Sequence, residues 1–166
     1  MPMLLHACQW IYHTRFSTSI RESVWVFPII ESINVLSITV LAGTIAVFDL
    51  RILGVLMNRE PVSAIARQVL PWTWTGFALM FVTGSLLSIA EAATNYYNLA
   101  FRIKLVLLVL AGLNPLIFHG SVFRKVGDWD LAKTAPLRAR VAATCSLMLW
   151  AGIIVAGRMI AYLEKP

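Results

Sequence analysis

Long runs of apolar residues, separated by short polar segments, dominate the pattern of the chain. Four runs are long enough to cross a bilayer, at about residues 24–48, 70–90, 103–123 and 141–163. A hydrocarbon core of about 30 Å requires about 20 helical residues. Because lipid cannot satisfy free backbone N–H and C=O groups, runs of this length are predicted to be helices. The pattern therefore predicts an all-α fold, an antiparallel bundle of four transmembrane helices that forms one membrane domain over residues 1–166.

The segment before the first run is too short and too polar to cross the membrane. It lacks both the basic first region and the small-residue cleavage site of a signal peptide. Trp10 and Tyr12 suit headgroup depth, so the segment is predicted to be a short interfacial helix on the outer leaflet. The run that starts at Ser17, followed by Glu22, is expected to cap the first spanning helix.

The composition supports a membrane protein. The chain is 59% hydrophobic and only 13% charged, with a mean hydropathy of +0.77. Soluble domains are about 45–50% apolar and about 25% charged. The net charge of +6 would suggest a nucleic-acid partner in a soluble protein. Here the basic residues fall at the ends of the apolar runs, so no nucleic-acid partner is expected.

The distribution of lysine and arginine predicts the orientation. Two connections on one side carry eight basic residues, and the opposite side carries five, with Arg158 inside the last run. Positive charge favours the cytoplasmic side, so both termini are expected in the periplasm, with the protein in the bacterial inner membrane. The connection GDWDLAKTAP is expected to be a polar loop in water. The eight are Arg51, Arg59, Arg67, Arg124, Lys125, Lys133, Arg138 and Arg140, and the five are Arg15, Arg21, Arg102, Lys104 and Lys165.

Polar side chains within the runs are the candidates for chemistry, because they are costly in lipid and normally face the bundle interior. Glu31 and Asn34 are three residues apart, which places them on one side of a helix. Arg158 is expected at the depth of Glu31, as its ion-pair partner, and Lys104 and Glu91 are expected near the same outer surface. The cluster is interpreted as a structural ion pair, with a proton or substrate site as the alternative.

The third run carries Asn114, Pro115 and His119. Pro115 has no N–H to donate to the carbonyl of Ala111, so a kink is expected there. Carbonyl groups freed by a kink can bind a side chain, water or an ion. His119 is expected at the cytoplasmic end as an interfacial residue rather than a ligand. The two cysteines lie in unrelated segments, and no metal site and no catalytic residue is predicted.

Several strings of the sequence resemble one protein family. They are Ile20–Gly54, IRESVWVFPIIESINVLSITVLAGTIAVFDLRILG, with LPWTWTGF, FVTGSLL, YYNLAFRIKL and LAGLNPLIFH. The family they resemble consists of small bacterial four-helix integral membrane proteins of unknown function, so the resemblance implies the fold but no activity. The chain is also distantly similar to the copper-resistance D-type membrane proteins and to b-type cytochrome-like bundles. That similarity implies haem b or copper as an alternative cofactor.

Asn34 departs from the pattern that the resemblance implies, which has histidine at this position. A buried histidine is what haem b or copper would require, and asparagine is not a usual axial ligand. His119 lies about 10 Å from the depth of Asn34, and His6 and His13 precede the first run. A bis-histidine haem is therefore not expected.

The sequence favours a protein without catalytic activity. It contains no G-x-S-x-G, glycine-rich phosphate loop, H-E-x-x-H or C-x-x-C motif, and four helices are few for an inverted-repeat transporter. The first hypothesis is an accessory subunit of a larger bacterial membrane complex of respiratory or photosynthetic electron-transfer type. Its partners would be lipid and either other membrane subunits or a second copy, and bound lipid is compatible with it. The alternative is a redox, metal-binding or haem-binding protein of b-type cytochrome-like ancestry.

Overall fold

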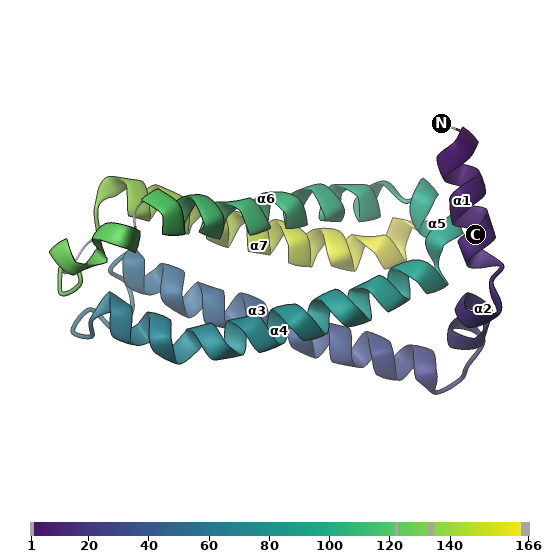
Figure 1. Cartoon of the computed structure of the whole chain (residues 1–166), viewed down its shortest axis with the longest axis horizontal. Helices are drawn as coiled ribbons and strands as arrows, with labels where there is room; N and C mark the ends of the chain where they lie inside the picture. The colour runs from purple at the N-terminus through teal and green to yellow at the C-terminus, as the bar shows by residue number, and fades with distance from the viewer. Residues whose placement is uncertain (1, 122, 133–134, 164–166) are drawn as a thin grey trace.

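Four long antiparallel helices form the body of the molecule in the computed structural model (Figure 1). They are α3 (Val26–Ile52), α4 (Val62–Ala90), α6 (Leu99–Ser121) and α7 (Leu137–Leu163). All four are long and apolar enough to cross a membrane, which confirms the predicted four-helix bundle and a multi-pass membrane protein. The structure describes the backbone of residues 2–121, 123–132 and 135–163, and the side chains of these except 2–5, 7, 119–121, 123–125, 161 and 163.

The helices are longer than the apolar runs. Helix α4 begins at Val62, about two turns before the predicted start near residue 70, and therefore includes Arg67. An apolar-run criterion misses these turns because the beginning of the helix carries polar residues, among them the exposed Arg67 and Gln68. Pro71 and Pro115 lie inside α4 and α6, and neither ends its helix.

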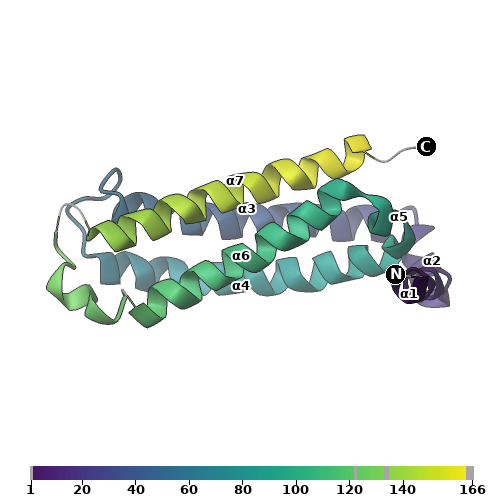
Figure 2. The same cartoon turned by 90° about the horizontal axis from the view of Figure 1, so that it is seen from above.

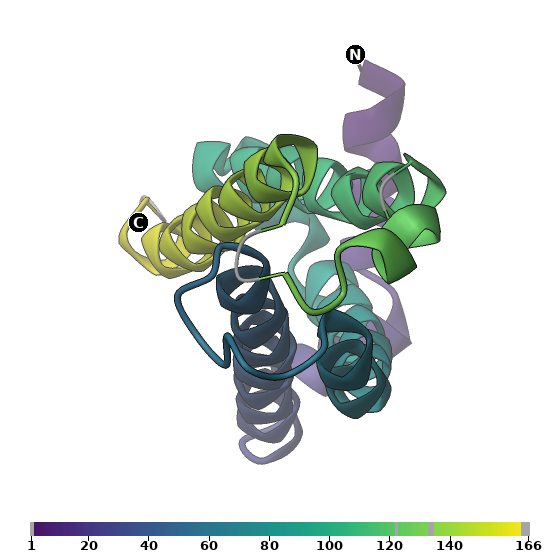
Figure 3. The same cartoon turned by 90° about the vertical axis from the view of Figure 1, so that its left-hand side faces the viewer.

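The bundle consists of two helical hairpins. Helix α3 packs along α4, α6 packs along α7, and the two hairpins meet mainly through α3 and α7 (Figures 2 and 3). Helices α3 and α4 approach each other closely at Gly76, where a Cβ atom would lie 3.1 Å from the backbone nitrogen of Leu41 and 3.2 Å from the carbonyl oxygen of Ser37. Small residues permit such close contact between membrane helices. Gly76 therefore fixes the register of the first hairpin.

Three short helices gather at the end of the bundle opposite the α3–α4 connection. They are α1 (Pro2–Tyr12), α2 (Arg15–Arg21) and α5 (Ala92–Tyr97). Helix α1 packs on α5 and α2 packs on α4, so the amino-terminal segment lies across the ends of the spanning helices, as Figure 1 shows. This position agrees with the predicted amino-terminal helix outside the spans.

The residues expected to cap α3 cap α4 instead. The Ser17 hydroxyl and the Arg21 guanidinium donate to the carbonyl of Ala90, at 3.2 Å and 3.1 Å. The last carbonyls of a helix have no partner within it, so this contact satisfies the end of α4. Helix α3 starts later, where the Ser23 hydroxyl accepts a hydrogen bond from the N–H of Val26 at 3.1 Å. The expected capping role of Ser17 was wrong because α2 is a separate helix.

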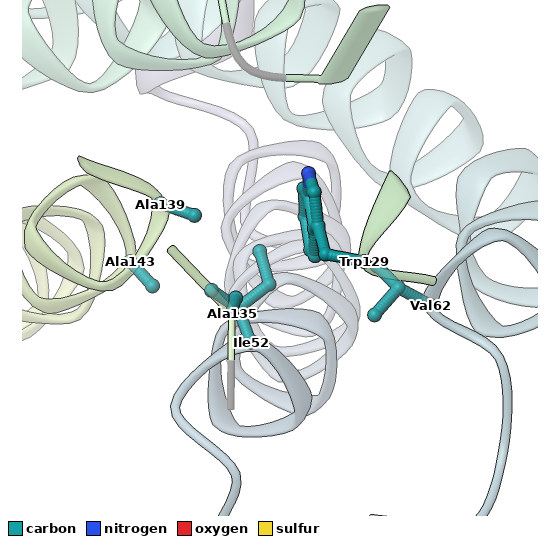
Figure 4. Close-up of a cluster of buried hydrophobic side chains, with 6 residues drawn as sticks. All are labelled: Ile52, Val62, Trp129, Ala135, Ala139 and Ala143. Atoms are coloured by element: carbon teal, nitrogen blue, oxygen red, sulfur yellow. The ribbon is translucent and has the colours of Figure 1, made fainter. Parts of the chain in front are cut away.

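The connection between α6 and α7 packs on the protein rather than lying free in water. After η1 (Phe123–Asp128), the Trp129 side chain is only 9% exposed. Figure 4 shows the cluster that it forms with Ile52, Val62, Ala135, Ala139 and Ala143. The prediction of a purely polar loop was wrong because Trp129 and Ala135 cover the ends of the helices.

Candidate functional site

The predicted ion pair between Glu31 and Arg158 is absent from the part of the chain that the structure describes. Both side chains are exposed, and the Arg158 guanidinium lies 5.9 Å from the centre of the Tyr162 ring. Three residues turn a helix by about 300°, so Glu31 and Asn34 point about 60° apart. That difference places Asn34 against α4 and Glu31 on the outer surface.

Asn34 joins α3 to α4. Its side chain is buried, and its amide nitrogen donates to the Thr83 hydroxyl at 2.9 Å and to the carbonyl of Met80 at 3.2 Å. Gly84 faces the same amide, since a Cβ atom there would lie 3.3 Å from Nδ2. The amide is thus used for helix packing, at the position where the resemblance implies a ligand.

Lys104 and Glu91 lie apart from Asn34. Lys104 is half-buried and lies against α7, with its Nζ 3.6 Å from where a Cβ atom of Gly157 would be. Glu91 is at the junction of α4 and α5, where its backbone N–H donates to the carbonyl of Leu87. Lys104 thus lies beside the residue that precedes Arg158, whereas Asn34 is engaged by α4.

Two of the three residues predicted around the proline of α6 line a cavity inside the bundle. The Asn114 amide donates to the carbonyl of Ala142 on α7 at 3.1 Å, and both Asn114 and Pro115 line the cavity. The cavity has a volume of about 220 Å³ and is enclosed by α3, α4, α6 and α7. The predicted role of His119 concerns a side chain that lies outside the described residues.

Asp49 is the charged residue of this cavity and was missed in the sequence, where it reads as the polar flank of an apolar run. Its side chain is 5% exposed, Ser146 of α7 is its hydrogen-bond partner, and its Oδ2 atom has no hydrogen-bond partner. The other polar side chains of the wall are Thr44, Thr73 and Asn114. Helix α3 continues to Ile52, one turn beyond the apolar run, and this extension places the Asp49 carboxylate inside the helix.

Arg51 is the second residue whose structural role was not predicted from the sequence. It is fully buried, and its Nε atom donates to the carbonyl of Glu60 at 2.8 Å. Its terminal nitrogens donate to the carbonyls of Asp130 and Ala132 at 3.4–3.5 Å. Arg51 therefore ties the α3–α4 connection to the α6–α7 connection, in addition to adding positive charge at this end of the bundle.

Asp130 caps the beginning of α4 from the other connection. Its carboxylate accepts hydrogen bonds from the N–H and the hydroxyl of Ser63, both at 2.7 Å, and its carbonyl accepts the N–H of Val62 at 3.1 Å. Partial desolvation acts to raise the pKa of the Asp130 carboxyl, but the bonds from Ser63 and the charge of Arg51 outweigh it and lower the pKa. The ionised carboxylate is thus the form that the fold favours.

Removing this cap should give a pH-dependent loss of stability. Because the pKa of Asp130 is lowered on folding, its contribution is full above about pH 3.9, the ordinary value, and disappears as the pH falls through the lowered value. We expect Asp130→Asn to cost about 1 kcal/mol at pH 7, as lost helix caps do. Thermal unfolding in detergent at pH 7 and pH 3 measures the effect. A difference between the two proteins that grows on acidification would contradict the assignment.

An aromatic ridge follows the outer surface of α4. We use this name for Trp74, Phe77 and Phe81, whose rings form a chain with centroid separations of 6.1 Å and 6.2 Å. The three side chains are 64%, 43% and 63% exposed. Their spacing of three and four residues places them on one face of the helix. This face does not pack on the described remainder of the protein.

The described residues do not fit a haem or a transition-metal ion. Within the described part of the chain, no three histidine, cysteine, aspartate or glutamate side chains are placed to share a metal ion. His6 and His13 are exposed near α1, and the Asn34 amide is bound to α4. A haem or copper site needs side-chain donors that converge inside the bundle. The redox alternative therefore rests on the sequence resemblance alone.

Comparison with known proteins identifies a family to which the chain is similar. The model of a family of unknown function (DUF6644) matches residues 22–163, which include all four spanning helices. No curated protein and no solved structure matched the chain. The match confirms the resemblance to a family of unknown function, and the similarity to copper-resistance and cytochrome-like proteins stays a prediction.

Proposed function

The chain belongs to the DUF6644 family, and we propose that it is a non-catalytic accessory subunit of a larger bacterial membrane complex. The aromatic ridge of α4 carries this proposal, because its exposed rings form a surface on which another membrane helix can pack. The sequence-based expectation of a respiratory or photosynthetic electron-transfer complex names the class of assembly to be tested first.

The aromatic ridge offers a protein partner both apolar rings and one hydrogen-bond donor, the Trp74 indole. The apolar run of α4 covers residues 70–90 and follows the exposed Arg67, so its middle is near Met80. Along the helix axis, Phe81 lies about 1.5 Å and Trp74 about 9 Å from that middle. Tryptophan in membrane proteins normally lies at the interface, where its N–H meets water or headgroups. A neighbouring helix with a hydroxyl or carbonyl acceptor would satisfy Trp74.

The wider surface of the bundle is compatible with the same role. Only 11–33% of the residues in the most apolar stretch of each spanning helix are buried within the described structure. Membrane helices associate through close packing and hydrogen bonds rather than through a hydrophobic driving force. The exposed carboxylate of Glu31 and the exposed Trp72 give further polar atoms that such packing can satisfy.

Site-specific photo-crosslinking tests the proposal. A benzoyl-phenylalanine residue at position 74, on the ridge, is irradiated in membranes of the native cell. The control position is Val109 on α6, which is 63% exposed and lies within its span. We expect Trp74→benzoyl-phenylalanine to give one discrete adduct with a different membrane polypeptide, identified by mass spectrometry, and the control to give none.

Two results of this experiment would contradict the accessory role. One is labelling of lipid alone from both positions, which would mean that the ridge faces the bilayer. The other is an adduct only with a second copy of the chain, which would make the ridge a homodimer contact instead of a heteromeric one. Equal protein adducts from both positions would also count against a specific partner at α4.

The proposal includes the bacterial inner membrane and periplasmic termini. The support is the excess of basic residues at the end that carries the α3–α4 and α6–α7 connections, eight against five. Arg59→Cys and Glu22→Cys introduce exposed thiols at the two ends. We expect a membrane-impermeant maleimide added to intact cells with an opened outer membrane to label position 22 but not 59. The native cysteines are first changed to alanine, and labelling of 59 alone would reverse the orientation.

A further inference from the structure

The cavity described above lies near the end of the bundle that carries the two connections. Its wall is mostly apolar, with Ile45, Phe48, Ala111 and Trp150 among its residues, and all four spanning helices contribute to it. An apolar cavity of about 150 Å³ in a protein is known to admit benzene. The 220 Å³ available here is about one and a half times that size. It suits one aromatic ring with a short side chain.

Asp49 gives the cavity one strongly polar position. One oxygen of its carboxylate is left without a hydrogen-bond partner although the side chain is buried. The two threonine hydroxyls of the wall have other acceptors, since Thr73 has the Val69 carbonyl and the Thr44 hydroxyl within reach of its one hydrogen, and Thr44 donates to the carbonyl of Leu41. Buried polar atoms in native proteins are almost always paired, so an unpaired one points to a missing partner.

No positive side chain of the described residues neutralises Asp49. Arg51 is two residues away, but its guanidinium is directed to the carbonyls of Glu60, Asp130 and Ala132. Carboxylates within membrane spans are expensive unless a cation or a proton accompanies them. The missing partner is therefore best supplied by a group that both donates a hydrogen bond and carries positive charge.

Entry to the cavity is available from the side of the bundle. Leu70 of α4 and Pro115 of α6 line the cavity and are also exposed on the outer surface. These two helices are not among the pairs that pack extensively in the described structure. A molecule dissolved in the bilayer can thus reach the cavity between α4 and α6 without passing through the connections.

We propose that this cavity is a binding site for a small lipophilic amine, whose ammonium group pairs with Asp49 and whose apolar body fills the space toward Ala111 and Trp150. The site is independent of the aromatic ridge and of the proposed accessory role, since it lies inside the bundle. The amine donates to Oδ2, and Ser146 retains its bond to the carboxylate.

Titration calorimetry of the detergent-purified full chain tests the site with 2-phenylethylamine as the probe. The neutral 2-phenylethanol has the same size and serves as the matched ligand. Asp49→Asn keeps the shape of the side chain but removes its charge, and Asp128→Asn is the exposed control. Ala142→Leu fills the cavity from its wall. Titrations into micelles without protein give the background from partitioning.

We expect saturable binding of the amine to the native protein and to Asp128→Asn. Asp49→Asn and the change to the alcohol should each weaken binding about tenfold or more, the factor for a hydrogen bond to a charged group. Ala142→Leu should abolish binding while thermal unfolding confirms that the protein is folded. No saturable binding to the native protein overturns the proposal, as does equal binding to Asp49→Asn or retained binding to a folded Ala142→Leu.

Discussion

Replacing Arg51 by alanine is expected to destabilise the protein more than any other single change at the connection end of the bundle. The guanidinium is fully buried and donates to three carbonyl groups from two connections. Its removal leaves those carbonyls without their donor and leaves a space where the buried side chain was. We expect a loss of about 3–5 kcal/mol, in the range found when buried charged networks are broken.

Thermal unfolding in detergent, followed by near-ultraviolet circular dichroism, measures this loss. Arg59→Ala is the matched control, because Arg59 is an exposed arginine of the same connection. It should change stability by no more than about 0.5 kcal/mol. Arg51→Lys keeps the charge but not the planar array of donors, so an intermediate loss is expected. Equal, small effects of Arg51→Ala and Arg59→Ala would show that Arg51 acts only through its charge.

Gly76→Leu should separate α3 from α4. A Cβ atom at Gly76 would already lie 3.1–3.2 Å from backbone and Cβ atoms of α3, which cannot rotate away as the end of a side chain does. Leucine has a higher helix propensity than glycine, so any loss of stability comes from packing rather than from helix propensity. We expect a loss of about 1–3 kcal/mol, the usual cost of overpacking, at the centre of the most extensive helix contact.

Gly43→Leu on α3 is expected to have the opposite effect on stability. Gly43 is exposed in the middle of α3, and a Cβ atom there would meet nothing within 4 Å. The substitution should raise stability by about 0.5–1 kcal/mol through helix propensity, and the added apolar surface faces lipid. Melting curves of the two variants and the native chain compare these effects. The same sign of change in both variants would refute the close α3–α4 contact at Gly76.

Two polar residues of α3 explain why the candidate site escaped prediction. Each spanning helix is apolar on nearly all sides, so the sequence carries little information about which side faces the interior. Glu31 lies inside the apolar run of residues 24–48, whereas Asp49 directly follows it, so the sequence favours Glu31 as the candidate. The packing of α3 on α4 turns Asn34 inward and leaves Glu31 exposed. Asp49 reaches the cavity because α7 approaches that end of α3 with Ser146.

The sequence by itself determined the number of spanning helices, their approximate limits and the family, because run length and the absence of backbone partners in lipid leave few alternatives. The rotation of each helix about its axis was decided only by tertiary packing, at small residues such as Gly76. Tertiary packing also decided the roles of Arg51 and Asp130, because both bind backbone groups that are far away in the chain, up to 81 residues for Arg51. Such contacts depend on which helix ends lie next to each other. The pattern of apolar and polar residues along one segment of the chain does not specify this arrangement.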